Sequence, residues 1–593
     1  MCGIVGQINY TGDKIDRVLF DSMRDALTHR GPDGYGTELL HNESIAFGHR
    51  RLSIIDLSDN GKQPMSNEDG SVWVTFNGEI YNFNNLKKEL VSKGHVFKSK
   101  SDTEVLIHGY EEWGIKNLLK KLKGMFAFAI YDQNNNKLIA ARDRFGIKPF
   151  YYFKDNEKLI FASELKAITK NPKFKKEIDN SSIADFFTYS YVPNPKTIWK
   201  NTKKLSPASF FEIDINKTCD IHEEKYWKLK SGNNIVSDKD AIEKANILIH
   251  RATKEHLTSD VPVGLFLSGG YDSSTLLMHM KDLKYDVNSF SIGFDNSNRS
   301  EHLIARDISS TFGSNHYENI LSEEADTFSL LEKLAFNFDE PFAISSMIPY
   351  YLASELAIQH SKVVIVGDGG DEAFAGYKWH YEINNYYKNL TLKKRIKEFI
   401  LSKSELNIQM YNKWMTGVYD ELINTSLVNK DISDMAKKQG LFLFKKYYDE
   451  TISPVKSWQL LDVHTFIPEP CLTRADRTSM AHSLEVRVPF LDHEIFEFTF
   501  QLNEKTYIKN GIKKFLIHQN LKNRVRKEII DMPKRGFSFQ HLYRLFDDKF
   551  YQLIKYGFLA KNDIIDVALI KKSSTRMKFH VLVLELWFQK NYM

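Results

Sequence analysis

Residues 261–277 read VPVGLFLSGGYDSSTLL, an apolar run followed by a glycine turn and a second apolar segment. The run that ends at Leu267 has the length and composition of a buried strand, and the apolar residues that return at Leu276 and Leu277 indicate a helix. A glycine turn between strand and helix can close backbone N–H groups around a phosphate, at the positive end of the helix dipole. Tight turns without a ligand need glycine too, so the glycines alone do not decide the function.

The other residues of this turn narrow its chemistry. It has no lysine of the Walker type, but it carries hydroxyls at Ser268, Ser273 and Ser274 and a carboxylate at Asp272. A carboxylate beside phosphates is repelled unless a Mg²⁺ ion lies between them. The turn therefore predicts magnesium and a nucleotide together.

A second acidic turn follows another apolar run. Residues 362–366, KVVIV, lead into residues 367–372, GDGGDE. Because the carboxyl ends of parallel strands share one edge of a sheet, Asp272 and Asp371 could hold the same ion. The alternative is two unrelated acidic turns.

The pattern around these turns predicts a multidomain α/β protein. Apolar runs at 261–267, 287–294 and 362–366, separated by helical segments, are typical of a doubly wound parallel sheet. Beyond about residue 378 the pattern is almost wholly helical, and we expect those helices to pack on the α/β core. The first 210 or so residues instead alternate short β-branched or aromatic runs with turns, as in antiparallel sheet with helices between.

A polar, irregular stretch separates the two parts, at residues 216–234. We therefore predict one domain at residues 1–215 and a second at 236–593.

Composition limits the class of protein. The net charge of +5 over 593 residues gives no reason to expect nucleic acid or a membrane as partner. No stretch approaches the roughly 18 apolar residues of a membrane helix, and the first residues lack the pattern of a signal peptide. The cysteines, Cys2, Cys219 and Cys471, are too few and too scattered for a disulfide framework or a zinc site. A cytoplasmic location is expected.

The chain begins MCGIVG, with a cysteine directly after the initiator methionine. Methionine before a small residue is normally trimmed, which would leave Cys2 with a thiol and a free α-amine. Such a residue could be both nucleophile and base. A cysteine at this position by chance would be a small hydrophobe without a catalytic role.

Several motifs together resemble a known family. SGGYDSS (268–274) and GDGGDE are similar to the pyrophosphate loop of ATP-cleaving ligases that form acyl-adenylates. MCGIVG, HRGPDGYG, FNGEIYN, RDRFGIKPFYY and FASELKA resemble the class II glutamine amidotransferase domain. ADRTSMAHSLEVRVPFLD (475–492) resembles a further hallmark of the glutamine-hydrolysing asparagine synthetases, and the likeness runs in order from residue 1 to about residue 540.

For the first domain the resemblance implies an Ntn-type layered α/β/β/α glutaminase with Cys2 as nucleophile. It implies that the Asn77 side chain and the Gly78 N–H hold the oxyanion. Arg51 would bind the α-carboxylate of glutamine, Asp102 its α-amine, and Glu79 would support the pocket.

For the second domain it implies an ATP-pyrophosphatase-type synthetase with added helices. Adenine would lie near Ile292, with backbone contacts at Leu267, Val366 and Gly367. Lys514, or Lys513 beside it, would neutralise phosphoryl charge, and Asp368 would handle the intermediate and the proton of ammonia. The pyrophosphate and Mg²⁺ would be held by Ser268, Gly269, Gly270, Asp272, Ser273 and Ser274, with Asp371 as a further metal ligand.

The acceptor is open at this point. Residues 339–352 resemble the acceptor-side segment of the family, with hydroxyls at Ser345 and Ser346, which favours aspartate. His518 and Met532 stand where the family often has basic residues, which leaves room for another carboxylate such as a uronic acid. The partners expected are glutamine, ATP and this acceptor, and a homodimer is allowed.

The sequence argues against two further classes of protein. A catalytically silent relative would lose the nucleophile or a metal carboxylate, yet Cys2, Asp272 and Asp371 are present. An enzyme that thiolates transfer RNA would need paired cysteines and a basic face, and the sequence has neither.

Overall fold

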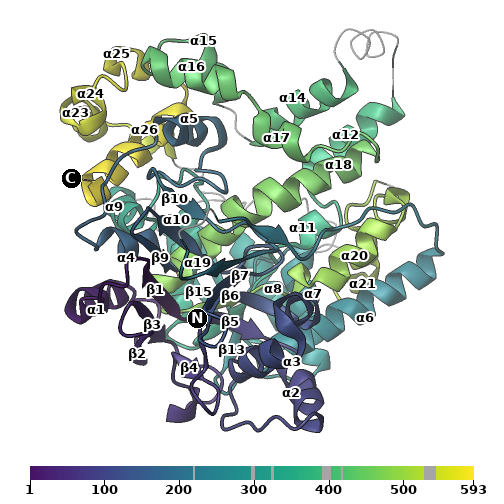
Figure 1. Cartoon of the computed structure of the whole chain (residues 1–593). Helices are drawn as coiled ribbons and strands as arrows, with labels where there is room; N and C mark the ends of the chain where they lie inside the picture. Colours follow the sequence, from purple (N-terminus) through teal and green to yellow (C-terminus); the bar gives the residue numbers. More distant parts are fainter. Residues whose placement is uncertain are drawn as a thin grey trace.

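The computed structural model of the chain describes residues 1–217, 221–294, 301–321, 326–389, 391, 402–415, 418–509, 511–526 and 542–592. Within these ranges it has three sheets, two antiparallel and one parallel (Figure 1).

The two antiparallel sheets belong to the N-terminal part. The first has the strand order β10 (Thr202–Lys204), β8 (Tyr151–Lys154), β9 (Lys158–Ala162), β1 (Gly3–Asn9), β3 (Ile45–Arg51), β2 (Gly34–Leu40). The second has the order β12 (Glu224–Lys225), β11 (Ser209–Asp214), β7 (Lys137–Arg142), β6 (Gly124–Asp132), β5 (Val72–Ile80), β4 (Met65–Ser66).

These sheets pack face to face around one apolar layer. Alternate residues of the strands point inward, so Ile4, Phe47 and Phe161 of the first sheet meet Ala127 and Tyr131 of the second. On the outer faces, α1 (Arg17–Asp25) and α4 (Leu165–Thr169) cover the first sheet, while α2 (Phe83–Ser92) and α3 (Glu104–Lys121) cover the second. The predicted α/β/β/α layering is confirmed.

The third sheet is parallel and lies in the C-terminal part. Its strand order is β15 (Asn315–Leu321), β14 (Asn288–Phe294), β13 (Val263–Phe266), β16 (Val363–Ile365), β17 (Glu485–Arg487). The chain runs outward from β13 to β15, then returns to β16 on the other side of β13. This reversal is the topological switch point of a doubly wound sheet, where ligands bind outside the carboxyl ends of the strands. The predicted doubly wound fold is confirmed.

Helices connect and cover these strands. The crossovers between the strands are made by α7 (Tyr271–Asp282), α8 (Glu301–Phe312), α9 (Thr327–Asn337) and α10 (Met347–Ala357). Ser237 caps α6 (Asp238–His256) by accepting from the N–H of Asp240, as its sequence pattern predicts.

Beyond residue 378 the described residues are mainly helical. They form α12 (Lys378–Lys388), α14 (Lys403–Met415), α15 (Tyr419–Asn424), α16 (Lys430–Gln439), α17 (Phe442–Tyr447), α18 (Pro454–Leu461), the π-helix η2 (Asp462–Thr473), α19 (Arg474–Met480), α20 (His493–Gln501), α21 (Phe515–Leu521), α23 (Asp548–Tyr556), α24 (Phe558–Lys561), α25 (Val567–Ile570) and α26 (Thr575–Trp587). The exception is β17, whose three buried residues pair with β16.

The two parts share a broad contact. Helix α5 (Asn180–Tyr189) of the N-terminal part packs on α15 and α16 (Figure 1). Residues 216–234, predicted as the linker, are partly built into this contact: Trp227 packs on Phe145 and donates a hydrogen bond to Glu497.

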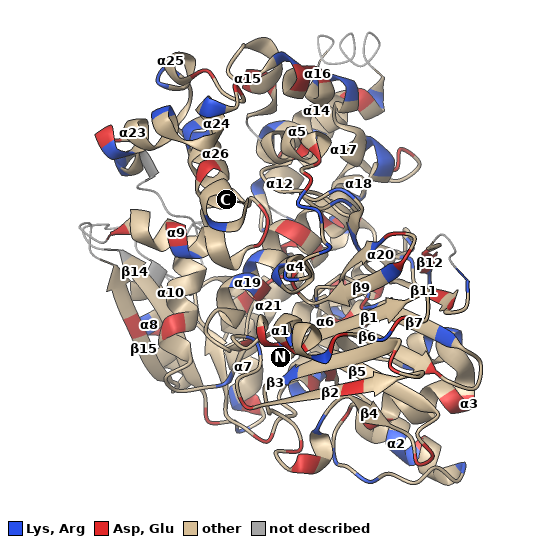
Figure 2. Cartoon of the chain, turned by 60° about the vertical axis from the view of Figure 1, so that its left-hand side comes forward, with Lys and Arg blue, Asp and Glu red and all other residues tan. Residues whose placement is uncertain are grey.

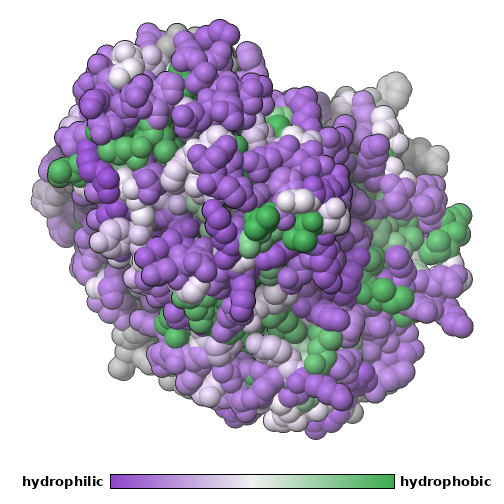
Figure 3. Space-filling model, turned by 60° about the horizontal axis from the view of Figure 1, so that its bottom comes forward, coloured by the Kyte–Doolittle hydropathy of each residue, from purple (hydrophilic) through white to green (hydrophobic). Residues whose placement is uncertain are grey.

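In the view of Figure 2, Lys and Arg positions are interspersed with Asp and Glu positions along the chain. The face in Figure 3 is mostly hydrophilic, with small scattered hydrophobic patches. Among the residues that the structure describes, none of the helices is both long and apolar enough to span a bilayer.

Candidate active sites

Cys2 lies at the start of β1, beside the middle of β5. Its backbone N–H donates to Oδ1 of Asn77 over 3.0 Å, and its Sγ lies 4.0 Å from the carbonyl oxygen of Leu52. Asn77 is fully buried, and its Nδ2 has no hydrogen-bond partner among the described residues. A buried polar group without a partner costs about 1–3 kcal/mol. This donor is therefore held beside the thiol at a cost that a ligand oxygen would relieve.

Gly78 follows Asn77 where β5 lies closest to β6. A Cβ at this position would lie 2.1 Å from the carbonyl oxygen of Met125, so only glycine fits. The sequence prediction brings Asn77 and Gly78 together with Cys2, and the structure does the same for Asn77.

Arg51 is the last residue of β3, and its side chain reaches into the loop that follows this strand. Its guanidinium donates to the carbonyl oxygens of Ser58, over 2.8 Å, and Asp56. The Asp56 carboxylate in turn accepts from the N–H of Lys100 over 2.8 Å. The backbone carbonyls of Ser58 and Asp56 therefore fix the orientation of the buried Arg51 guanidinium.

Asp102 and Glu79 are buried acids at the other side of this pocket. Oδ2 of Asp102 accepts from the N–H of Ile80 over 2.8 Å, and burial raises the pKa of Asp102 to about 6. Burial and the charge of Glu485 raise the pKa of Glu79. Burial also raises the pKa of the Cys2 thiol. Burial therefore disfavours the charged forms of Asp102, Glu79 and Cys2.

Two residues of this pocket come from the C-terminal part and had no role in the sequence prediction. Glu485 of β17 lies 3.0 Å from the α-amine of Met1, and Arg487 lies 2.7 Å from Glu485 and 3.4 Å from Glu79. The strand SLEVRVPF carried the signal, because charged residues alternate there with apolar ones in a segment that is otherwise apolar.

The second candidate site lies at the switch point of the parallel sheet. After β13 the turn at residues 267–270 is closed by its own hydroxyls: Ser273 Oγ donates to the carbonyl of Gly270 and lies 3.2 Å from Ser268 Oγ. Ser274 is buried on the first turn of α7. Gly269 has φ +76°, and a Cβ there would lie 2.7 Å from Ile304, so this position requires glycine.

Asp272 and Asp371 meet across the switch point, as the parallel-sheet argument predicts. Nζ of Lys514 lies between them, 2.5 Å from Oδ2 of Asp272 and 2.6 Å from Oδ1 of Asp371. A Cβ on Gly370 would lie 2.5 Å from Oδ1 of Asp272, so the second turn approaches the first with no room for a side chain. All three charged groups are buried.

The residues predicted around adenine lie at the same edge. The Leu267 N–H donates to Phe290 and the Val366 N–H donates to Arg487, which extends the ladders of β13 and β16. Ile292 is buried on β14, the neighbour of β13. A Cβ on Gly367 would lie 2.8 Å from Cβ of Asp272.

Asp368 faces the acceptor-side segment. Arg474 donates to Oδ2 of Asp368 and to Oγ of Ser346, each over 3.0 Å, and its guanidinium stacks 4.7 Å above the Tyr350 ring. The sequence prediction did not include Arg474, which lies just before the hallmark segment. Ser345 contributes its carbonyl to the start of α10, where it accepts from Ile348.

Of the two positions that left the identity of the acceptor open, the structure describes one. His518 is buried on α21 with its ring 5.6 Å from that of Tyr271, on the first turn of α7. Met532 lies outside the described residues.

A short path of contacts joins the two sites. Arg30 donates to the carbonyl oxygen of Cys2 over 3.1 Å and makes a bidentate pair with Asp476 on α19, at 2.7 and 2.8 Å. Arg474, at the start of the same helix, holds Asp368. One helix therefore contacts both sites.

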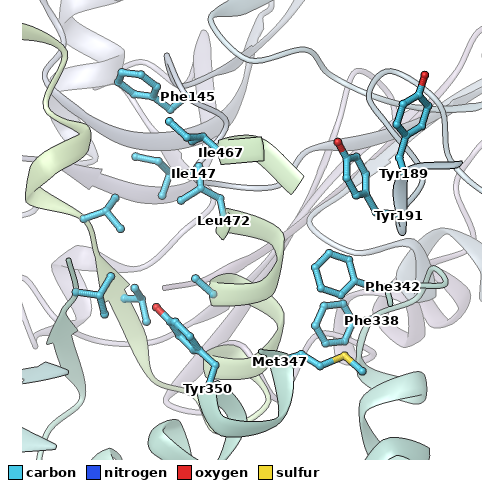
Figure 4. Close-up of a cluster of buried hydrophobic side chains, with 14 of the residues drawn as sticks. Phe145, Ile147, Tyr189, Tyr191, Phe338, Phe342, Met347, Tyr350, Ile467 and Leu472 are labelled. Atoms are coloured by element: carbon cyan, nitrogen blue, oxygen red, sulfur yellow. The ribbon is translucent and has the colours of Figure 1, made fainter. Parts of the chain in front are cut away.

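Buried apolar side chains fill the space beside this path. Figure 4 shows Phe145 and Ile147 of the N-terminal part beside Ile467 and Leu472 of η2, with Tyr350 at the far end.

Comparison with known proteins matches the two parts of the chain to two domain families. Residues 1–227 match the glutamine amidotransferase domain, and residues 244–588 match asparagine synthase. The chain belongs to the asparagine synthase family. The family predicted from the sequence motifs, and the two kinds of domain, are confirmed.

Relatives match over most of the chain. Asparagine synthetase [glutamine-hydrolyzing] 1 of Bacillus subtilis is 34% identical over 568 residues, which is 91% of this chain and 87% of that protein. A putative asparagine synthetase [glutamine-hydrolyzing] 2 of Methanocaldococcus jannaschii is 34% identical over 73% of this chain and 86% of its own. A solved glutamine phosphoribosylpyrophosphate amidotransferase from B. subtilis covers 50% of this chain and 68% of its own, with 19% identity and a TM-score of 0.29.

Proposed function

We propose that the protein is an ATP-dependent amidoligase that converts aspartate to asparagine, with glutamine as the nitrogen donor and AMP and pyrophosphate as further products. Residues 1–215 would act as the glutaminase domain and residues 236–593 as the synthetase domain. The observation that carries the proposal is the unpartnered amide donor of buried Asn77 beside Cys2, in a chain whose other domain brings two carboxylates to a switch point.

In the first half-reaction Cys2, freed of Met1, attacks the side-chain amide of glutamine. Its α-amine takes the thiol proton, which is an option only for a first residue. The tetrahedral oxyanion forms within reach of Asn77 Nδ2 and the Gly78 N–H. The α-amine passes its proton to the leaving nitrogen, so that collapse expels ammonia and leaves a thioester, and water then hydrolyses the thioester to release glutamate and the free thiol.

Selection of glutamine follows from the charges of the pocket. Arg51 presents a guanidinium for the α-carboxylate, and Asp102 a carboxylate for the α-ammonium. Burial raises the pKa of Asp102, so its charged form is disfavoured in the empty site. The α-ammonium of bound glutamine would stabilise this charged form.

In the second half-reaction the side-chain carboxylate of aspartate attacks the α-phosphate of ATP, and pyrophosphate leaves. Ammonia then attacks the acyl carbon. The bond between this carbon and the phosphate oxygen breaks, and AMP leaves. Ser268, Ser273 and the N–H groups of the turn lie where they would hold the pyrophosphate, at the N-terminus of α7. Lys514 neutralises charge on the phosphates, and Asp368 receives a proton from ammonia.

Asp272 and Asp371 fit Mg²⁺ by their chemistry and placement. Both are buried carboxylates that approach one cationic position, the Nζ of Lys514, at 2.5 and 2.6 Å. Carboxylate oxygens are the ligands that Mg²⁺ prefers. Bound there, the ion would neutralise charge on the pyrophosphate; Lys514 would then turn from the carboxylates toward phosphate.

Arg474 favours aspartate among the carboxylate acceptors. Its guanidinium donates to both Asp368 and Ser346, so it places a cation beside the acceptor-side segment. A cation there can pair with the α-carboxylate of an amino acid. A site that pairs such groups rejects acceptors that lack them, because its own polar groups would remain unpaired.

The test is pyrophosphate release with ATP and ammonium, screened over aspartate and a panel of uronic acids and their nucleotide conjugates. We expect release with aspartate and asparagine as the amide product. Release with a uronic acid and none with saturating aspartate would contradict the assignment and support an amidase of sugar carboxylates.

A further inference from the structure

A group of histidines and glutamates lies on α3 and in the segment before it, and none of these residues has a role in the two sites described above. Among the described residues, His95, His108 and Glu111 are the group of three possible ligands that could hold one metal ion, with one ligand atom from each within 4.8 Å of the others. His95 lies in the segment between α2 and α3, and the other two lie on consecutive turns of α3.

The ligand atoms that face each other are specific. Nδ1 of His108 lies 3.2 Å from Oε2 of Glu111, and Nδ1 of His95 lies 4.0 Å from the same oxygen. Two ligands of a tetrahedral ion with bonds of 2.0–2.1 Å lie about 3.3 Å apart. The His108–Glu111 distance already fits this value, and His95, which is half-buried, needs a small rotation.

The remaining atoms of the three side chains have polar partners that fix their direction. Nε2 of His108 faces Glu104 at 3.7 Å, and Nε2 of His95 faces Glu112 at 3.4 Å. Oε1 of Glu111 accepts from Asn67 over 2.8 Å. Metal-bound histidines almost always direct their second nitrogen to a carboxylate or carbonyl, and that partner sets the tautomer. Here both histidines have such a carboxylate.

We propose that His95, His108 and Glu111 form a binding site for a divalent transition metal ion of the zinc class, with Glu104 and Glu112 as outer partners. Two imidazoles and one carboxylate are a ligand set that zinc uses in proteins, with a water as the fourth ligand. A hard ion such as Mg²⁺ would instead prefer oxygen ligands. This proposal does not depend on the proposed function.

The site would join two segments of the N-terminal part. Glu104 already accepts from the N–H groups of Lys98 and Ser99, at 2.7 and 2.8 Å, which ties residues 98–99 to the start of α3. An ion between His95 and α3 would add a second tie in the same segment. Metal binding would therefore stabilise the folded form by mass action.

The test measures zinc uptake and cobalt spectra on the full-length protein. The metal-free protein is dialysed against Zn²⁺ or Co²⁺ with excess Mg²⁺, so that the oxygen-rich site at Asp272 is occupied by magnesium. We expect one Zn²⁺ per chain, a rise in Tm with zinc, and the strong visible absorption of four- or five-coordinate Co²⁺.

Variants decide whether the named residues hold the ion. His95→Ala changes a half-buried residue and should abolish both the zinc uptake and the cobalt band, while Glu112→Gln should lower zinc affinity about 10–100-fold. His222→Ala, an exposed histidine of the same chain, is the matched control and should bind as the wild type does. No uptake by the wild-type protein, or equal uptake and spectra in wild type and His95→Ala, would overturn the proposal.

Discussion

The two sites of this chain hold their polar groups in opposite ways. At Cys2 the donor Asn77 Nδ2 is buried with no partner among the described residues, so this donor is in place before a ligand arrives. At the switch point Nζ of Lys514 pairs with both Asp272 and Asp371, at 2.5 and 2.6 Å, so its positive charge offsets part of their negative charge.

This difference indicates which of the two sites rearranges its side chains when a ligand binds. On the proposed function, the first pocket keeps its unpaired donor for an oxyanion, which is preorganisation. The second would exchange an internal ion pair for contacts with Mg²⁺ and ATP. Variants at the first site should therefore affect glutamine hydrolysis alone, and variants at the second should stop adenylation with either nitrogen source.

The largest effect is expected for Cys2→Ala. Glutamine-dependent synthesis should be abolished, while synthesis from added ammonium should remain, because only glutamine hydrolysis uses the thiol. Asparagine is measured with each nitrogen source. A tag retained ahead of Cys2 should give the same result, since it places the base in a peptide bond. Loss of the ammonium-dependent activity in a folded Cys2→Ala protein would contradict the two-site account.

Asp272→Asn or Asp371→Asn should stop pyrophosphate release with glutamine and with ammonium, because the metal loses a charged ligand where pyrophosphate forms. Glutaminase activity should largely survive. Asp282→Asn, at the other end of α7 and paired with Arg524 at the surface, is the matched control and should release pyrophosphate normally. Normal release by one of the first two variants would remove that residue from the metal site.

Asn77→Ala should lower kcat for glutamine hydrolysis by about 10²–10³, the usual cost of one oxyanion donor. Steady-state glutaminase kinetics measure this, with ammonium-dependent synthesis as the internal control. A kcat within a few-fold of the wild type would show that Nδ2 of Asn77 does not meet the oxyanion.

The smallest effect concerns pH. Burial raises the pKa of Asp102 to about 6, so this acid is protonated in the free folded protein below pH 6. Any contribution of this proton to the stability of the folded protein is present at low pH and is lost as the pH rises through 6. The α-ammonium of glutamine needs the ionised form. The kcat/KM for glutamine should therefore fall below pH 6, by about tenfold per unit, and Asp102→Asn should flatten this part of the profile. A wild-type profile without this limb would contradict the role of Asp102.

Much of the second site was predictable from sequence because it depends on local rules. The strand, turn and helix at 261–277 follow from the apolar runs and glycines, and the meeting of Asp272 with Asp371 follows from parallel strands ending at one edge. The register of the lysine could not be predicted in this way. Lys514 has φ +50°, in the left-handed region, so the helical phase before α21 gives no guide to which lysine points inward.

The contacts between the domains could not be predicted from sequence. Glu485 and Arg487 reach Met1 and Glu79, and Arg30 reaches Asp476, through the packing of the C-terminal part on the N-terminal part. Nothing in the local pattern around Arg30 indicates a partner so far along the chain. The sequence interpretation did not include His95 and His108 as metal ligands, because these histidines meet only through the packing of the segment before α3 on that helix.

The central claim is that nitrogen released at Cys2 is used at the switch point of the same molecule. The most direct test supplies amide-¹⁵N glutamine, ATP and aspartate in the presence of unlabelled ammonium, and measures the label in the product by mass spectrometry. The account predicts asparagine that carries ¹⁵N well above the fraction in the bulk ammonium, with AMP and pyrophosphate formed in equal amounts. Asparagine labelled only to the bulk fraction, or no asparagine at all, would contradict it.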